Sequence, residues 1–230
     1  MADIGPLRVA VSRGALVANA RLAGEDAIAD LRREAYGHGI TVVAQALAEA
    51  GVAAAIVDET GRAAAEAAGL AVTDASPTLD SRTLYGLPGG AGAPAMRLSG
   101  SILSTKRLLA GEGVSYNATH VAARDTRIAL VSGGFGQGVV RALGNRVDVE
   151  LAGRRHPIVG RVAMDVCVVD IGDEDAAPGD EVVYFGGTGP LRDGLAAWEQ
   201  ATGLTGAELV CALGVRAATP GLWLRREVVG

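Results

Sequence analysis

Apolar and polar positions follow two different periods along the chain, and the period changes near residue 87. Short apolar runs alternate with segments of helical period over the first part. The runs are 8–11, 27–31 and 53–57, and the helical segments are 15–22, 40–50 and 61–68. Gly51 and Gly69 follow two of these segments, at the position where glycine commonly ends a helix. Strands that alternate with helices are typical of parallel βαβ units, so the pattern predicts a small α/β region.

The second part of the chain follows the period of two that is typical of β-strands. It begins after residues 87–94, a Pro/Gly-rich stretch that we interpret as a linker. The predicted strands are 96–103, 128–131, 147–151, 157–170 and 181–185, and helices are expected at 191–201 and 206–213. We therefore predict two domains, residues 1–87 and residues 95–230, of which the second is rich in β-structure.

Composition excludes several classes of protein. Apolar residues make up 49% and charged residues 20% of the 230 positions, which is ordinary for a globular chain. The net charge of −5, with no Lys/Arg cluster, argues against nucleic-acid binding. No apolar run is long enough to span a membrane, and no basic segment followed by an apolar one opens the chain. We expect a cytoplasmic protein in which Cys167 and Cys211 are buried free thiols.

Metal and nucleotide sites are not predicted. The three histidines, His38, His120 and His156, lack metal-ligand spacing with Cys, Asp or Glu. The glycine-rich segment 132–138 is followed by Val139, so it fails the dinucleotide-binding pattern, and it lies among predicted strands. We therefore expect no metal ion and no nucleotide cofactor.

Several short motifs occur in one order along the chain. The clearest is Ala35-Tyr36-Gly37-His38-Gly39 within residues 32–39. The others are Ala15–Asn19, Ile56–Glu59, Glu66–Leu70, Arg82–Leu87, Gly113–Tyr116, Gly160–Asp165 and Gly179–Val183. Together they resemble the signature loop and the later motifs of the alanine racemase family. Because the matches keep the family's order and cover most of the chain, we identify the protein as a truncated, degenerate member of that family.

The resemblance implies a fold and also implies that part of that fold is missing from this chain. The family begins with an eight-stranded TIM barrel, of which this chain matches the first, second and last units. We expect an α/β remnant of a TIM barrel, with about three parallel strands and their helices, followed by a racemase-like C-terminal β-rich domain. In a closed barrel the eighth strand neighbours the first, so the expected order is last, first, second. Residues 82–87 resemble the close of the last strand.

Such a remnant has exposed sheet edges and an uncovered face, which are aggregation liabilities. We expect them to be covered by a second copy of the chain, by the chain's own β-domain or by a partner. The family builds its active site between two subunits, so a homodimer is the leading expectation.

The cofactor lysine of the family is replaced. By resemblance, the lysine that carries pyridoxal phosphate (PLP) falls on Arg32, and a guanidinium cannot form a Schiff base. The chain has 20 arginines and a single lysine, Lys106. The family's arginine that faces the pyridine nitrogen falls on Leu79, with Arg82 nearby, and a phosphate-holding tyrosine falls on Ala207. We therefore expect no PLP and no other cofactor.

The candidate site residues also come from the resemblance, and each has a structural alternative. Tyr116 matches the catalytic tyrosine, whose phenol is a poor base unless a cation such as Arg32 or Arg82 lowers its pKa, and the alternative is a core aromatic residue. His38 is a candidate acid or base, and the alternative is a ring bonded within its own loop. Candidate substrate-binding residues are Arg32, Tyr36, Arg82, Met164 and Asp165; they could equally be a solvated arginine or retained turn residues.

Three functions remain open on the sequence. The first is a PLP-independent enzyme that isomerises or cyclises a small polar or carboxylate-bearing metabolite in a biosynthetic pathway. The second is a non-catalytic binding or regulatory protein that pairs with itself or with another enzyme. The third is residual racemase chemistry with PLP held non-covalently.

Overall fold

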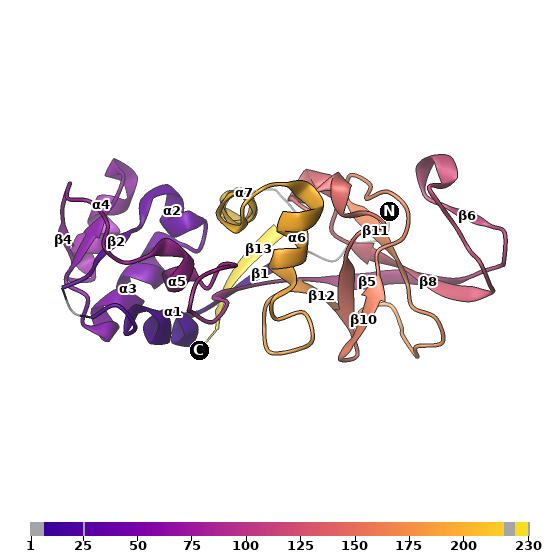
Figure 1. Cartoon of the computed structure of the whole chain (residues 1–230), viewed down its shortest axis with the longest axis horizontal. Helices are drawn as coiled ribbons and strands as arrows, with labels where there is room; N and C mark the ends of the chain where they lie inside the picture. The colour runs from indigo at the N-terminus through magenta and orange to yellow at the C-terminus, as the bar shows by residue number, and fades with distance from the viewer. Residues whose placement is uncertain (1–6, 25, 219–223, 230) are drawn as a thin grey trace. The chain divides into compact units, whose positions relative to one another are not determined.

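The computed structural model describes residues 7–24, 26–218 and 224–229 (Figure 1). Contacts divide the chain into two compact units. The β-rich unit comprises residues 1–8, 97–204 and 220–225, and the α/β unit comprises residues 9–96, 205–219 and 226–230. The C-terminal segment 205–219 therefore groups with the α/β unit, although the sequence pattern placed it in the second domain. The two predicted domains, residues 1–87 and 95–230, are defined by their resemblance to the family and not by these contacts, so they stay a prediction.

The α/β unit is built on a three-stranded parallel sheet of order β2-β3-β4. Its strands are β2 Ile28–Asp30, β3 Ala54–Ile56 and β4 Ala71–Val72. Its helices are α1 Arg13–Ala20, α2 Arg32–Tyr36, α3 Ile40–Ala50, α4 Arg62–Ala67, α5 Ser81–Tyr85 and α7 Gly206–Ala218, with a 3-10 turn at Glu59–Gly61. The predicted strands at 27–31 and 53–57 and helices at 15–22, 40–50 and 61–68 are confirmed to within a few residues; β4 was not predicted.

Local side-chain bonds set the ends of these elements. Ser12 caps α1 by accepting a hydrogen bond from Ala15 N at 3.1 Å. The buried amide of Asn19 in α1 donates to Leu84 O and Ala93 O and accepts from Ala93 N. The segment 87–94, interpreted as a linker from its composition, is thus attached to the body of the α/β unit.

The prediction that residues 82–87 close a strand is wrong. They lie in and after helix α5, because the carboxylate of Asp80 accepts hydrogen bonds from Arg82 N and Thr83 N and starts a helix there. Gly86, with φ of 62°, ends it. Just before α5, Thr78 N and Leu79 N both donate to Ile28 O in β2 at 3.0 Å. This is the neighbour relation expected between the last and first units of a barrel, although the barrel origin itself stays a prediction.

The described part of the β-rich unit consists of antiparallel strands, one α-helix and three 3-10 turns. Its strands are β5 Met96–Leu108, β6 Gly113–Val114, β7 His120–Val121, β8 Thr126–Ser132, β9 Asp148–Leu151, β10 Arg154–Pro157, β11 Val166–Asp170 and β12 Glu181–Phe185, and its helix is α6 Gly194–Thr202. The order is β10-β9-β12-β5, with β8 on β5 and β11 on β8. Strands β1 Leu7–Ser12 and β13 Leu224–Val229 follow β5 in this order, and each is divided between the units.

Strand β5 links two sheets in the β-rich unit. Its first half pairs with β12 and its second half pairs with β8, with a register shift between Ile102 and Ser104 (Figure 1). Trp198 of α6 covers β12, with its ring 5.2 Å from that of Phe185 and 6.3 Å from that of Tyr184, both edge-on. The single predicted strand 157–170 is wrong, because residues 158–165 form a turn segment between β10 and β11.

Cys167 is a buried free thiol, as predicted, and burial raises its pKa to about 12. Cys211 is also free but only half-buried. Among the residues that the structure describes, no helix is long and apolar enough to cross a membrane.

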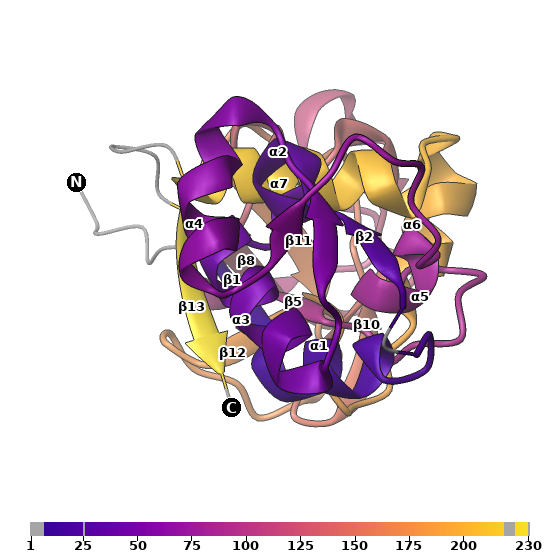
Figure 2. The same cartoon turned by 90° about the vertical axis from the view of Figure 1, so that its left-hand side faces the viewer.

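Helix α7 packs closely on α2, and glycine makes this possible (Figure 2). Gly37 ends α2 with φ of 79°, and a Cβ atom there would lie 2.7 Å from Val210 O and 2.9 Å from Gly214 Cα. The chain's own C-terminal helix therefore covers part of the α/β unit.

Replacing Gly37 by alanine tests this packing. Gly69 has a similar φ of 87°, and a Cβ atom there would have no neighbour within 4 Å in the described chain, so Gly69→Ala is a matched control. We expect Gly69→Ala to lower the free energy of unfolding by about 1–2 kcal/mol through backbone strain alone. Gly37→Ala should lower it by about 2 kcal/mol more, because the methyl group clashes with α7. Urea unfolding measures both, and equal losses would contradict the packing argument.

Candidate functional site

The segment after β2 has an uncommon backbone. Arg33, Glu34, Ala35 and Tyr36 have φ of 56°, 58°, 51° and 54°, so α2 is a left-handed turn, not the loop expected from the sequence. A left-handed conformation costs about 1–2 kcal/mol per residue with a side chain. Such a run persists only where its surroundings hold it in place.

Hydrogen bonds hold the left-handed turn from both ends. Asp58, which follows β3, accepts from Arg33 N at 3.0 Å, and this bond is the main reason that the pKa of Asp58 is lowered. Leu31 O accepts from Ala35 N and Glu34 O accepts from Gly39 N. Asp58 thereby connects the turn to the neighbouring strand of the sheet.

An ion pair lies at the start of the turn. Arg32 Nε donates to Asp30 Oδ1 at 2.9 Å, and Arg32 Nη2 donates to Asp30 Oδ2 at 2.6 Å. Asp30 is buried, at 3% exposure, whereas the Arg32 side chain is 55% exposed. Burial alone would raise the pKa of Asp30, but the hydrogen bonds and charge of Arg32 outweigh it, so the pKa is lowered. Asp30 was not predicted as a site residue.

Three aromatic rings lie against this pair. The Tyr85 ring stacks on His38 at 4.6 Å and lies 4.9 Å from the Tyr36 ring. The Tyr85 hydroxyl donates to Asp30 O at 2.8 Å, and burial raises its pKa well above the ordinary value. The Tyr36 hydroxyl points to Asp30 Oδ2 at 3.4 Å. We call Asp30, Arg32, Tyr36, His38 and Tyr85 the Asp30 cluster.

His38 is fully buried within this cluster. Its Nδ1 lies 3.2 Å from both Ala35 O and Tyr36 O, and since a carbonyl only accepts, Nδ1 carries the proton. This geometry favours the structural alternative for His38, and its catalytic role stays a prediction. Within the described chain, no hydrogen bond or ion pair joins the exposed Arg82 side chain of α5 to the Asp30 cluster.

The remaining predicted residues belong to the β-rich unit. The backbone of Tyr116 is described, but its side chain lies outside the described part of the chain. Its neighbours Ser115, Asn117 and Ala118 have φ of 66°, 63° and 43°. The Ser115 hydroxyl donates to Arg161 O at 2.8 Å and accepts from Arg161 N at 3.1 Å. The Tyr116 turn is therefore strained and tied to the segment that leads to Met164.

The Met164–Asp165 turn is supported by the glycine-rich segment 132–138. Gly133 N donates to Asp165 O, Phe135 N to Ala163 O and Gly136 N to Met164 O, all within 2.9 Å. A Cβ at Gly134 would collide with Met164 O. The buried Gln137 accepts from Gly134 N and closes the segment. Met164 itself is 58% exposed, so the turn presents an apolar side chain to solvent.

Comparison with known proteins gives the family. The model of the alanine racemase C-terminal domain matches residues 95–219, which is more than half of the chain. The chain belongs to the alanine racemase family. A curated alanine racemase of Thermobifida fusca is 43% identical over 123 residues, which cover 54% of this chain and only 33% of that relative. The chain thus spans well under two thirds of the length of the curated relatives it matches.

Solved alanine racemases share the fold at lower identity. The enzyme from the D-cycloserine producer Streptomyces lavendulae aligns with a TM-score of 0.79 and 21% identity, over 99% of this chain and 98% of that chain. The enzyme from Bartonella henselae, described with covalently bound pyridoxal phosphate, aligns with a TM-score of 0.76 and 16% identity, over 98% and 100% of the two chains. These likenesses support a racemase-like fold with its C-terminal domain.

The residues present do not fit covalently bound PLP. The position that resembles the cofactor lysine is Arg32, whose guanidinium is already bonded to Asp30 through two nitrogens. No group of side chains suited to a metal ion occurs among the described residues.

The lowered pKa of Asp30 predicts a pH-dependent contribution to stability. A carboxyl group whose folded pKa is depressed contributes stability above its ordinary value, here 3.8, and loses it as the pH falls through the folded pKa. We expect Asp30→Asn to lower the free energy of unfolding by about 1–2 kcal/mol at neutral pH. The difference from the wild type should shrink below pH 3.8. Denaturant unfolding across this range measures it, with the exposed Asp74→Asn as control, and a pH-independent difference would contradict the ion-pair explanation.

Proposed function

We propose that this alanine racemase-family chain acts without PLP, as an isomerase or cyclase on a small carboxylate-bearing metabolite. The observation that carries the proposal is the bidentate pair of Arg32 with Asp30, which takes the place of the cofactor amine. The curated relatives are named alanine racemases, but that chemistry needs an amine that can lose its proton. The chain offers only a guanidinium at the corresponding position.

The turn at Tyr116 supports a catalytic use of the remaining motifs. Three of its residues have positive φ, and Asn117 and Ala118 are exposed, so no core packing explains the strain. Strained backbone clusters at functional sites, which favours a functional role for this turn. In an isomerisation, the Tyr116 phenolate would accept a proton from one face of a substrate carbon, and a solvent water molecule would donate a proton to the other face. Such a step needs no external oxidant or reductant.

A second candidate is a binding protein that pairs through its C-terminal domain. The family model matches that domain over residues 95–219, whereas structural alignment over nearly the whole chain gives 21% identity. Met164, at 58% exposure on a turn held by three backbone bonds, is a suitable contact for another chain. In this proposal the C-terminal domain is retained for assembly, with a second copy or with a full-length racemase.

Arg32→Lys tests the PLP-independent part of the proposal. We expect the variant to form no Schiff base with added PLP, measured by absorbance, and to give no detectable alanine racemisation. The reason is that Asp30 would pair with the new ammonium and keep it protonated. The double variant Asp30→Asn with Arg32→Lys separates this effect from loss of the rest of the site. Racemisation by either variant would overturn the proposal.

Tyr116→Phe tests the catalytic part. Native mass spectrometry of the purified protein first identifies any retained small molecule, which then serves as the assay substrate. We expect the variant to lose about 100-fold or more in turnover, the usual contribution of a general acid or base, with an unchanged melting temperature. Full activity in Tyr116→Phe would eliminate this tyrosine. A ligand-free chain that instead assembles with a racemase subunit would replace the enzyme proposal by the binding protein.

A further inference from the structure

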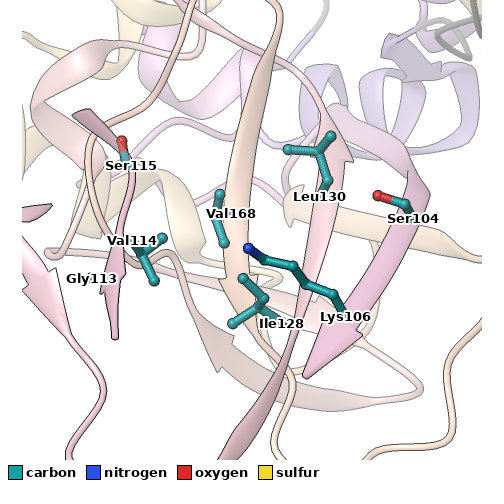
Figure 3. A pocket seen from close by; sticks show the side chains of 8 residues that line it. All are labelled: Ser104, Lys106, Gly113, Val114, Ser115, Ile128, Leu130 and Val168. Atoms are coloured by element: carbon teal, nitrogen blue, oxygen red, sulfur yellow. The ribbon is translucent and has the colours of Figure 1, made fainter. Parts of the chain in front are cut away.

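A pocket of about 310 Å³ opens on one face of the β-rich unit (Figure 3). It is lined by residues of β5, β8, β11 and the β6 region: Ser104, Lys106, Gly113, Val114, Ser115, Ile128, Leu130 and Val168. We call it the Lys106 pocket. Its volume falls within the range of about 300–1,000 Å³ that is typical of small-molecule sites.

The strand register explains why these side chains share one face. Ser104 pairs with Leu130, which pairs with Val168, and Lys106 pairs with Ile128 in the next row. Because side chains alternate along a strand, Thr105 and Arg107 of β5 point to the opposite face. Figure 3 shows Lys106 extending across the pocket toward Val168, with Ile128 beside it. The pocket is therefore an apolar surface crossed by one ammonium group.

The Lys106 ammonium has no partner among the residues that the structure describes. No described carboxylate lies within ion-pair distance, and no hydrogen bond to it is formed. Asp170 ends the cross-strand row of Lys106 and Ile128, but its carboxylate accepts from Thr126 Oγ1 and Gly172 N. On the opposite face, Arg107 does have an acidic partner, Asp125 at 4.0 Å. An unpaired cation beside apolar side chains is suited to an anionic ligand with an apolar part.

We propose that the Lys106 pocket binds a small amphipathic monocarboxylate. The carboxylate would pair with Lys106 and accept from the Ser104 hydroxyl, for which the described chain shows no other bond. The apolar chain of the ligand would lie on Val114, Ile128, Leu130 and Val168. Ser115 adds little to recognition, since its hydroxyl is already bonded to Arg161 N and O.

The pocket also bears on the proposed function. Ser115 lines it and Tyr116 is the next residue, so a bound carboxylate would lie beside the strained Tyr116 turn. Use of the pocket as the substrate site rests on the proposed function. Carboxylate binding by the pocket does not rest on the proposed function, because it depends only on Lys106 and the apolar lining.

Calorimetry with octanoate and octanol on the full chain tests this inference. We expect octanoate to bind at one site and octanol to bind at least about tenfold more weakly, since it lacks the charge. Lys106→Gln should weaken octanoate binding by about tenfold or more. Arg107→Gln is the matched control, because this side chain is 78% exposed on the opposite face of the same strand. It should leave the affinity unchanged.

Further variants separate the pocket from general charge and from catalysis. Leu130→Ala should also weaken octanoate binding, because it removes part of the apolar surface, and Lys106→Arg should retain most of it. Equal affinity for octanol and octanoate, no binding at all, or the same loss in Arg107→Gln would each overturn the inference. Full activity in Tyr116→Phe would count against the proposed function and leave the pocket in place, because carboxylate binding depends on Lys106 and not on Tyr116.

Discussion

Four consecutive left-handed residues, Arg33 to Tyr36, connect β2 to α3, and contacts from other parts of the α/β unit offset the conformational cost of that turn. Each such residue costs about 1–2 kcal/mol relative to an ordinary conformation. The turn is held by Asp58 from the next strand and by the contact of Gly37 with α7. The same turn sets the direction of Arg32 and Tyr36, both of which point to Asp30.

The ion pair that results limits what the side chain at position 32 can do chemically. A carboxylate that is buried without a nearby cation is strongly unfavourable. Asp30 is buried, and the Arg32 guanidinium supplies the cation. Asp30 and Arg32 therefore belong together physically. A lysine at position 32 would be held as a charged ammonium by the same carboxylate. The guanidinium and the buried acid thus form one unit, whose chemistry a lysine substitution alone does not change.

Much of the fold follows from the sequence pattern, whereas much of the site does not. Helix α3 was predicted at its observed bounds because its apolar period and its terminal Gly51 agree. Helix α5 was not predicted, because residues 82–87 resemble the end of a strand in the family. The sequence did contain a helix signal, since Asp80 is a suitable N-cap residue just before them. The left-handed turn could not be predicted, since Arg33 and Glu34 have no preference for positive φ and the turn depends on Asp58, which is distant in the sequence. Asp30 did carry a signal, because an acidic residue within an apolar strand requires a partner.

The two strained segments have different physical support, and this separates their roles. Ala35 of the left-handed turn and His38 just after it are fully buried, and several backbone bonds close the turn, so packing and hydrogen bonding account for its strain. Asn117 and Ala118 of the Tyr116 turn are exposed, and the main tie is the pair of hydrogen bonds between the Ser115 hydroxyl and Arg161. Strain that packing explains is part of the fold, whereas strain at an exposed turn beside a pocket needs another cause. We therefore propose the Tyr116 turn and the Lys106 pocket, and not the position of the family's cofactor lysine, as the functional centre of this chain.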